Sequence, residues 1–244
     1  MASRALAASQ SDRIFYTTMG IVIAATVFAG FAPTYYLSHW FNPPARMPTM
    51  NPLLHVHAVV FTLWIVLGVV QPALVANGKR ELHKKLGWLA AGTAVLVWLL
   101  GNLVSVQSIK YGYKGVGDPY AFYAITFFSI QAFAVIMILA ILKRKRAQTH
   151  KRLMLLSSAA ILEAAFGRLP FRIMAETAPL SFYVGSDLII LAGVVYDLAK
   201  RGKVHPVWSW GGGALVASQF FRIAIMQTAL WLAFSHWVAS LWPY

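Results

Sequence analysis

The amino-acid sequence predicts an all-α fold, a polytopic bundle of about seven transmembrane helices with a cytoplasmic N-terminus. Of the 244 residues, 59% are hydrophobic and only 11% are charged, whereas soluble domains carry about 25% charged residues. Apolar runs long enough to cross a bilayer core of about 30 Å recur along the whole length. The Lys and Arg residues lie mainly in short loops between these runs. We therefore expect residues 1–244 to form a single transmembrane domain.

The first predicted spans follow from apolar runs and the breaks between them. A short polar segment, MASRALAASQSD, precedes the first run and lacks the apolar core of a signal peptide, so we expect a cytoplasmic tail. Prolines at 43, 44 and 48 keep the next loop out of a helix, and Pro52 suits the first turn of the second span. The predicted spans are, by length and apolarity, about 15–38, 53–76, 86–108, 120–142, 153–175, 182–198 and 212–238.

The loops between these spans predict the orientation. The loops NGKRELHKK, KRKRAQTHKR and KRGKVHP are strongly basic and alternate with the Pro-rich loop, the Gly-rich YGYKGVGDP and a short turn at Ala178 and Pro179. By the positive-inside rule the three basic loops are cytoplasmic and the C-terminus is outside. This distribution explains the net charge of +14 without a nucleic-acid partner. The aromatic residues expected at the outer interface are Trp40, Tyr111, Tyr113, Tyr120, Trp237 and Trp242, and those at the inner one are Trp88, Trp208 and Trp210.

Ionisable side chains within membrane spans are rare and usually paired or functional, and the candidates are Glu163, Arg168, Arg172, Asp187 and Arg222. From their depth, we expect two interhelical ion pairs, Glu163 with Arg222 and Arg168 with Asp187. The alternative is that they line a polar cavity for a proton or an anionic ligand. Arg168 and Arg172 are four residues apart and share a helix face, which leaves an anion site open.

The histidines form two candidate sets at different depths. Haem b in a helical bundle needs two neutral imidazoles at equal depth on neighbouring helices, and His83 with His150 form such a set on the inner side. His55 or His57 with His236 form the outer set, which could also hold a metal ion, with Asp187 as a further ligand. The alternative for each is an interfacial histidine bonded to backbone or lipid phosphate.

Other chemistry is limited by what the chain lacks. It contains no cysteine, which excludes disulfides, thiolate ligands, iron–sulfur clusters and c-type haem attachment. It has no Ser-His-Asp arrangement, no paired carboxylates, no phosphate-binding Gly-rich loop and no HExxH motif. The buried amides expected to join helices or to line an outer cavity are Gln71, Asn102, Gln107 and Gln131.

Several segments resemble known membrane proteins. The segments DRIFYTTMG, HVHAVVFTLW, LHKKLG, HKRLMLLSSAAIL and YDLAKRGKVHP together resemble a family of bacterial integral membrane proteins without an assigned activity. More distantly, HxH near a span start followed by LHKKLG is similar to di-haem membrane cytochromes b and to haem A synthases. That similarity implies an inner haem on His83 and His150. It implies an outer haem starting from His55 or His57, whose partner position on the fourth span offers no histidine, only Tyr120 and Tyr123.

These observations lead to one leading functional prediction and two alternatives. The leading prediction is a multi-pass protein of the bacterial inner membrane with a redox or cofactor-binding role, holding haem b or a metal through histidines. A quinone or a larger membrane complex would be its partner. The first alternative is an accessory or assembly subunit of such a complex that binds no cofactor itself. The second is a small-molecule carrier with an outward-facing site at Arg168 and Arg172.

Overall fold

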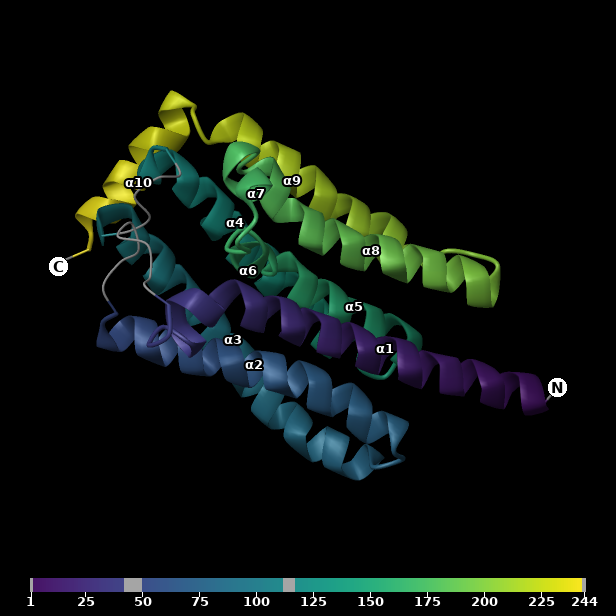
Figure 1. Cartoon of the computed structure of the whole chain (residues 1–244). Helices are drawn as coiled ribbons and strands as arrows, with labels where there is room; N and C mark the ends of the chain where they lie inside the picture. Colours follow the sequence, from purple (N-terminus) through teal and green to yellow (C-terminus); the bar gives the residue numbers. More distant parts are fainter. Residues whose placement is uncertain (1, 42–49, 112–116, 243–244) are drawn as a thin grey trace.

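The computed structural model describes residues 2–41, 50–111 and 117–242. These residues form a bundle of helices running back and forth between two ends, and no strand occurs among them (Figure 1). The elements are α1 (Ala2–Phe31), the π-helical turn η1 (Ala32–Tyr36), α2 (Pro52–Ala76), α3 (Arg80–Tyr111), α4 (Pro119–Leu142), α5 (Ala147–Ala160), α6 (Glu163–Phe166), α7 (Arg172–Glu176), α8 (Leu180–Arg201), the π-helical turn η2 (Val207–Gly212), α9 (Gly213–Ile225) and α10 (Ala229–Ser240).

The two ends of the bundle differ in chemistry, as the loop sequences predict. We call the end that carries the turns after α2, α4 and α8 the basic end, because those turns hold clusters of Lys and Arg. The opposite end carries the connections after η1, α3 and α7, together with α10. The two chain termini lie at opposite ends of the bundle (Figure 1). The Pro-rich and Gly-rich loops predicted at the opposite end lie partly in residues 42–49 and 112–116, outside the described residues.

The helices make the chain a multi-pass membrane protein by length and composition. Five are long and apolar enough to cross a membrane, in 10–36, 52–76, 80–110, 119–142 and 180–201. A sixth candidate combines the segment from η2 through α9 with α10, which are bent by 89°. The segment predicted as a span over residues 212–238 is therefore bent and not one regular helix. Helix α9 ends at Ile225, and Thr228 caps the start of α10 because its side chain accepts a hydrogen bond from the Trp231 N–H.

The predicted span over residues 153–175 is also interrupted. Helix α5 ends at Ala160, the short helix α6 begins at Glu163, and a non-helical turn precedes α7. Pro170 lies in that turn, and a proline cannot donate the backbone hydrogen bond that a continuing helix needs. The charged side chain of Glu163 thus lies at a helix break rather than within a regular helix.

Other helix boundaries agree with local sequence signals. Asn51 caps α2 by accepting a hydrogen bond from the Leu54 N–H at 3.0 Å, and Pro52 occupies the first helical position as predicted. Asp118 caps α4 in the same way, through the Tyr120 N–H at 2.9 Å.

Helix α5 lies inside the bundle and contacts α1, α4 and α8. Its centre is fully buried, including Leu156 and Ala159. Helix α1 approaches α6 closely at Gly30. A Cβ atom added at Gly30 would lie only 2.1 Å from the Ala165 carbonyl oxygen. Only glycine allows the two backbones to come so near. The close approach holds the break between α5 and α6 against α1.

A buried ion network joins the helices at the basic end. Arg152 on α5 and Asp197 on α8 form an ion pair in which both side chains are fully buried. Arg201 lies 3.2 Å from Asp197 and 2.9 Å from Asp12, and Lys151 lies 2.6 Å from Asp12. Because a buried charge is stable only when it is paired, this network fixes α1, α5 and α8 relative to one another.

Candidate functional site

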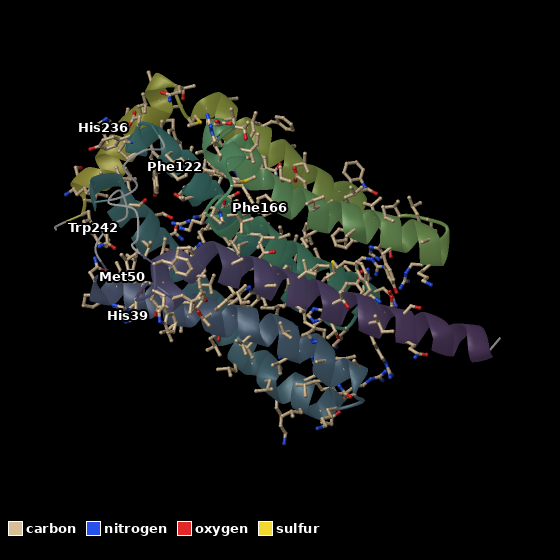
Figure 2. All side chains as sticks on the ribbon, in the orientation of Figure 1. His39, Met50, Phe122, Phe166, His236 and Trp242 are labelled. Carbon is tan, nitrogen blue, oxygen red and sulfur yellow. The ribbon has the colours of Figure 1, made fainter. Side chains whose placement is uncertain are left out.

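A cavity of about 280 Å³ lies between α1, α2, α3, α4 and the break that follows α5. It extends toward the opposite end, where η1 and the residues before α4 line it, and it is partly open. Its surface is mostly apolar, and Phe122, labelled in Figure 2, lines it near the start of α4. The polar and charged lining residues are Thr34, Tyr35, Tyr36, His57, Thr62, Ser105, Ser108, Thr126, Ser129, Ser158, Glu163 and Arg168.

One charged wall of the cavity is the predicted ion pair of Glu163 with Arg222, which is confirmed. The Nη1 atom of Arg222 lies 2.9 Å from the Glu163 carboxylate and 2.7 Å from the Ser129 hydroxyl oxygen. Its Nη2 atom donates to Ser218 at 3.0 Å. The Ser129 hydroxyl also bonds the Glu163 carboxylate. The Arg222 side chain is fully buried, whereas Glu163 and Ser129 line the cavity. The break at α6 therefore presents a compensated carboxylate to the cavity.

The predicted pairing of Arg168 with Asp187 is wrong. Asp187 accepts a hydrogen bond from the Gln219 side chain at 2.8 Å, and no ion pair joins the two predicted partners, both of which lie among the described residues. The turn after α6 directs Arg168 toward α1, where its guanidinium lies 4.8 Å from the centre of the Phe31 ring. Arg168 lines the cavity, while Arg172 is 92% exposed and pairs with Glu176. The two arginines therefore do not form a shared anion site.

His57 is the histidine that reaches the cavity. The centre of its ring lies 4.0 Å from the centre of the Phe61 ring, and Arg168 and the Leu100 backbone are among its surroundings. Its Nδ1 atom is buried and has no hydrogen-bond partner among the described residues. In the tautomer that carries the proton on Nε2, Nδ1 is an acceptor. An O–H or N–H group of a ligand that reached this nitrogen would satisfy it.

The three histidines predicted as an outer metal site lie in separate surroundings. His55 is exposed beside Tyr35, and His236 stacks on Tyr120 at 3.7 Å on α10. Figure 2 places His236 on the far side of this end from His39 and Met50. Among the residues that the structure describes, no group of three or more His, Asp or Glu side chains could hold a metal ion. The bend before α10 carries His236 away from the cavity.

The inner pair of histidines lies at the basic end, with His83 in the first turn of α3 and His150 in the first turn of α5. The Nδ1 atom of His150 lies 2.9 Å from the Ala140 carbonyl oxygen, which leaves its Nε2 atom free of that bond. The Nδ1 atom of His83 is buried without a partner in the described part of the chain. A histidine that donates from Nδ1 to a backbone carbonyl is oriented as metal-ligating histidines usually are.

The predicted amide contacts are partly confirmed. Gln131 donates to Asn102 at 2.8 Å and accepts from the Trp98 indole at 3.0 Å, joining α3 to α4 outside the cavity. Gln71 instead has a buried Oε1 atom without a partner among the described residues.

Sequence reasoning missed the ion pair of Arg152 with Asp197. A usable signal existed, because Asp197 is an acid beside a basic loop, with Arg201 one turn later. His205 lies beside this ion pair, and its backbone nitrogen lies 3.3 Å from the Asp197 carboxylate. Burial and the Arg152 charge lower the pKa of His205 below its usual 6.5, against the raising effect of Asp197. The His205 Nδ1 atom accepts the Val207 N–H at 3.2 Å, a bond that requires this nitrogen to be unprotonated.

In comparisons with known proteins, no family model, no curated protein and no solved structure matches the chain.

Proposed function

We propose that this protein binds a lipophilic small molecule with a hydroxyl-bearing head, of the quinol class, in the cavity beside His57. The observation that carries the proposal is the buried, unpartnered His57 Nδ1 atom at a mostly apolar cavity. Ligand sites are typically apolar pockets with a few polar groups that orient the ligand. A quinol hydroxyl would donate to His57, and Arg168 would donate to an oxygen on the same ring.

The size of the cavity favours this class over a porphyrin. Its volume of about 280 Å³ is slightly below the range for ligand pockets, about 300–1,000 Å³. That volume suits a head of one ring with a tail that leaves through the open side. The redox role expected from the sequence would then be carried by the ligand.

We infer a topology of seven membrane-crossing segments in a bacterial inner membrane, with the basic end in the cytoplasm. The broken pair α5 and α6 would form the fifth segment, and α9 the seventh. The positive-inside rule supports this orientation, as does the placement of the termini at opposite ends. The cavity would then open toward the outer leaflet, where a lipophilic ligand can enter from the bilayer.

Equilibrium binding of decylubiquinol to the purified protein tests the proposal. Its dimethyl ether is the matched ligand, because it keeps the shape and loses both O–H donors. We expect decylubiquinol to bind about 5–30 times more tightly, the effect of one net hydrogen bond of about 1–2 kcal/mol. The change His57→Phe should abolish the difference, and His55→Phe, two residues away but outside the cavity, should preserve it. Equal affinity for the two ligands in the wild type refutes the proposal.

A second candidate function is supported by the His83–His150 pair. Two imidazoles, each with a nitrogen available, suit the two axial positions of haem b better than they suit a metal that needs more protein ligands. Bound haem would supply one-electron chemistry, and the Ala140 carbonyl would keep His150 oriented. A dithionite-reduced difference spectrum of the purified protein tests this, because haem gives a Soret band that His150→Ala removes. Purification with a larger complex, without haem and without quinol binding, would favour the accessory-subunit role.

A further inference from the structure

The face of α2 that turns into the bundle carries polar side chains at a seven-residue spacing. His57, Trp64 and Gln71 follow one another at this interval. Seven residues at 100° each return to within about 20° of the same direction, about 10.5 Å further along the helix. Trp64 and Gln71 are only 2% and 8% exposed. The three side chains therefore form one line that runs from the cavity toward the basic end.

Each member of this line has a polar atom that the described residues leave without a hydrogen bond. These atoms are Nδ1 of His57, Nε1 of Trp64 and Oε1 of Gln71. Burying a polar atom in apolar surroundings without a partner is unfavourable, and more so inside a membrane. Packing accounts for the ring of Trp64, which meets the Phe133 ring edge-on, but it does not account for three unpartnered polar atoms at a regular spacing on one helix face.

The line continues onto the neighbouring helix. Gln71 is five residues before the end of α2, about 7.5 Å from it, and His83 is three residues after the start of α3, about 4.5 Å from it. The two side chains therefore lie at similar depths on helices that pack against each other. His83 also has an unpartnered buried Nδ1 atom, and His150 lies at the same basic end. The line thus joins the cavity at one end to a pair of histidines at the other.

We propose that this line is a gated water path that carries protons between the cavity and the histidine pair at the basic end. In this conformation protein atoms cover all four unpartnered atoms, so the path is closed. Water entering between α2 and its neighbours would satisfy them, which makes the hydrated form accessible in free energy. The alternating donors and acceptors suit a chain of hydrogen-bonded waters, and histidine is the side chain that exchanges protons most readily near neutral pH.

The proposed step is a proton relay without net chemistry. A proton taken up at one end displaces another along the waters, and one leaves at the other end. No electron moves, no covalent bond to carbon changes, and the transmembrane proton gradient supplies the driving force. The path depends on the geometry of the cavity but not on the identity of its ligand.

Proton flux into lipid vesicles that hold the purified full-length protein and an internal pH-sensitive dye tests the relay. With a valinomycin-imposed potassium potential, we expect flux above that of empty vesicles, and at least a fivefold reduction in Gln71→Leu and Trp64→Phe. Gln131→Leu is the matched control, because it makes the same chemical change at an amide that is already hydrogen-bonded outside the cavity. Wild-type flux equal to that of empty vesicles, or equal flux in all variants, overturns the proposal.

Hydroxyl-radical footprinting of the wild-type protein supplies a measurement that does not depend on any variant folding. Radiolysis of bound water oxidises nearby side chains even when they are buried. Trp64 and Trp231 are both buried tryptophans, at 2% and 7% exposure, but the Trp231 indole already donates to the Tyr120 carbonyl at 3.1 Å. We expect Trp64 to be oxidised faster than Trp231 despite its lower exposure. Equal or slower oxidation of Trp64 contradicts a water path.

Discussion

Replacing Arg222 by methionine is expected to destabilise the protein more than any change at a lipid-facing position. The guanidinium is fully buried and holds Glu163, Ser129 and Ser218 at 2.7 to 3.0 Å. Methionine fills similar space but donates no hydrogen bond. The change leaves the Glu163 carboxylate buried, with the Ser129 hydroxyl as its remaining donor among these contacts.

The magnitude follows from the burial of the pair. Removing one partner of a buried ion pair destabilises a protein by about 3–5 kcal/mol, because the other charge stays uncompensated. For a chain of this length, 1 kcal/mol changes the Tm by about 2–4 °C, so Arg222→Met should lower it by about 6–20 °C. Combining Glu163→Leu with Arg222→Met removes both charges and should restore most of the loss.

Thermal unfolding in detergent, followed by tryptophan fluorescence, measures these differences. The matched control is Arg172→Met, since Arg172 also forms an ion pair but is 92% exposed. An exposed ion pair contributes little, so the control should change the Tm by less than about 4 °C. If Arg222→Met and Arg172→Met behave alike, or if the double variant is as unstable as the single one, the account of the charged wall is refuted.

Three further predictions concern the ends and contacts of the bundle. The pKa of His205 is lowered in the folded protein, so the unfolded chain takes up a proton first as the pH falls through 6.5, and the free energy of unfolding should decrease on acidification. The change His205→Asn keeps a hydrogen-bond acceptor at this position. It should reduce the pH dependence of unfolding measured from pH 7.5 to 5.5. Gly30→Ala should destabilise by about 1–3 kcal/mol because its Cβ meets a carbonyl oxygen, whereas Gly68→Ala, where a Cβ would meet nothing within 4 Å, should be neutral or stabilising; equal effects on the Tm would contradict the close approach. Since the chain has no native cysteine, Ser240→Cys should react with an impermeant thiol reagent in intact cells and Lys145→Cys only after permeabilisation, and the reverse pattern would overturn the proposed orientation.

The sequence predicts the helical class and most helix boundaries because the signals are local. Proline at position 52 and the capping residues before α2 and α4 act within one turn, and apolar runs set helix lengths. The sequence did not predict the break after α5 or the bend before α10. Backbone groups at each of them are hydrogen-bonded within the local turn, so neither requires a conspicuous polar segment in the sequence. The residues around Thr228 are so apolar that hydropathy alone predicts one continuous span across them.

The candidate site was predicted only in part, for a similar reason. Depth along a helix can be counted from the sequence, so the pair of Glu163 with Arg222 was found. The direction in which a side chain points from its helix axis cannot be predicted across an irregular turn, so the predicted pairing of Arg168 with Asp187 was wrong. His57, a member of the predicted outer set, lines the cavity, but its separation from His236 depends on the bend before α10. The line from His57 through Gln71 was present in the sequence as a regular spacing, and only burial on one face gives it meaning.

A structure of the purified protein in lipid nanodiscs with decylubiquinol, determined by electron cryomicroscopy, tests the central claim most directly. The account predicts density for a single-ring head in the cavity, with an oxygen about 3 Å from the His57 Nδ1 atom and Arg168 on the same head. Density that contacts only the apolar walls, or ligand bound elsewhere with the cavity closed, would contradict it.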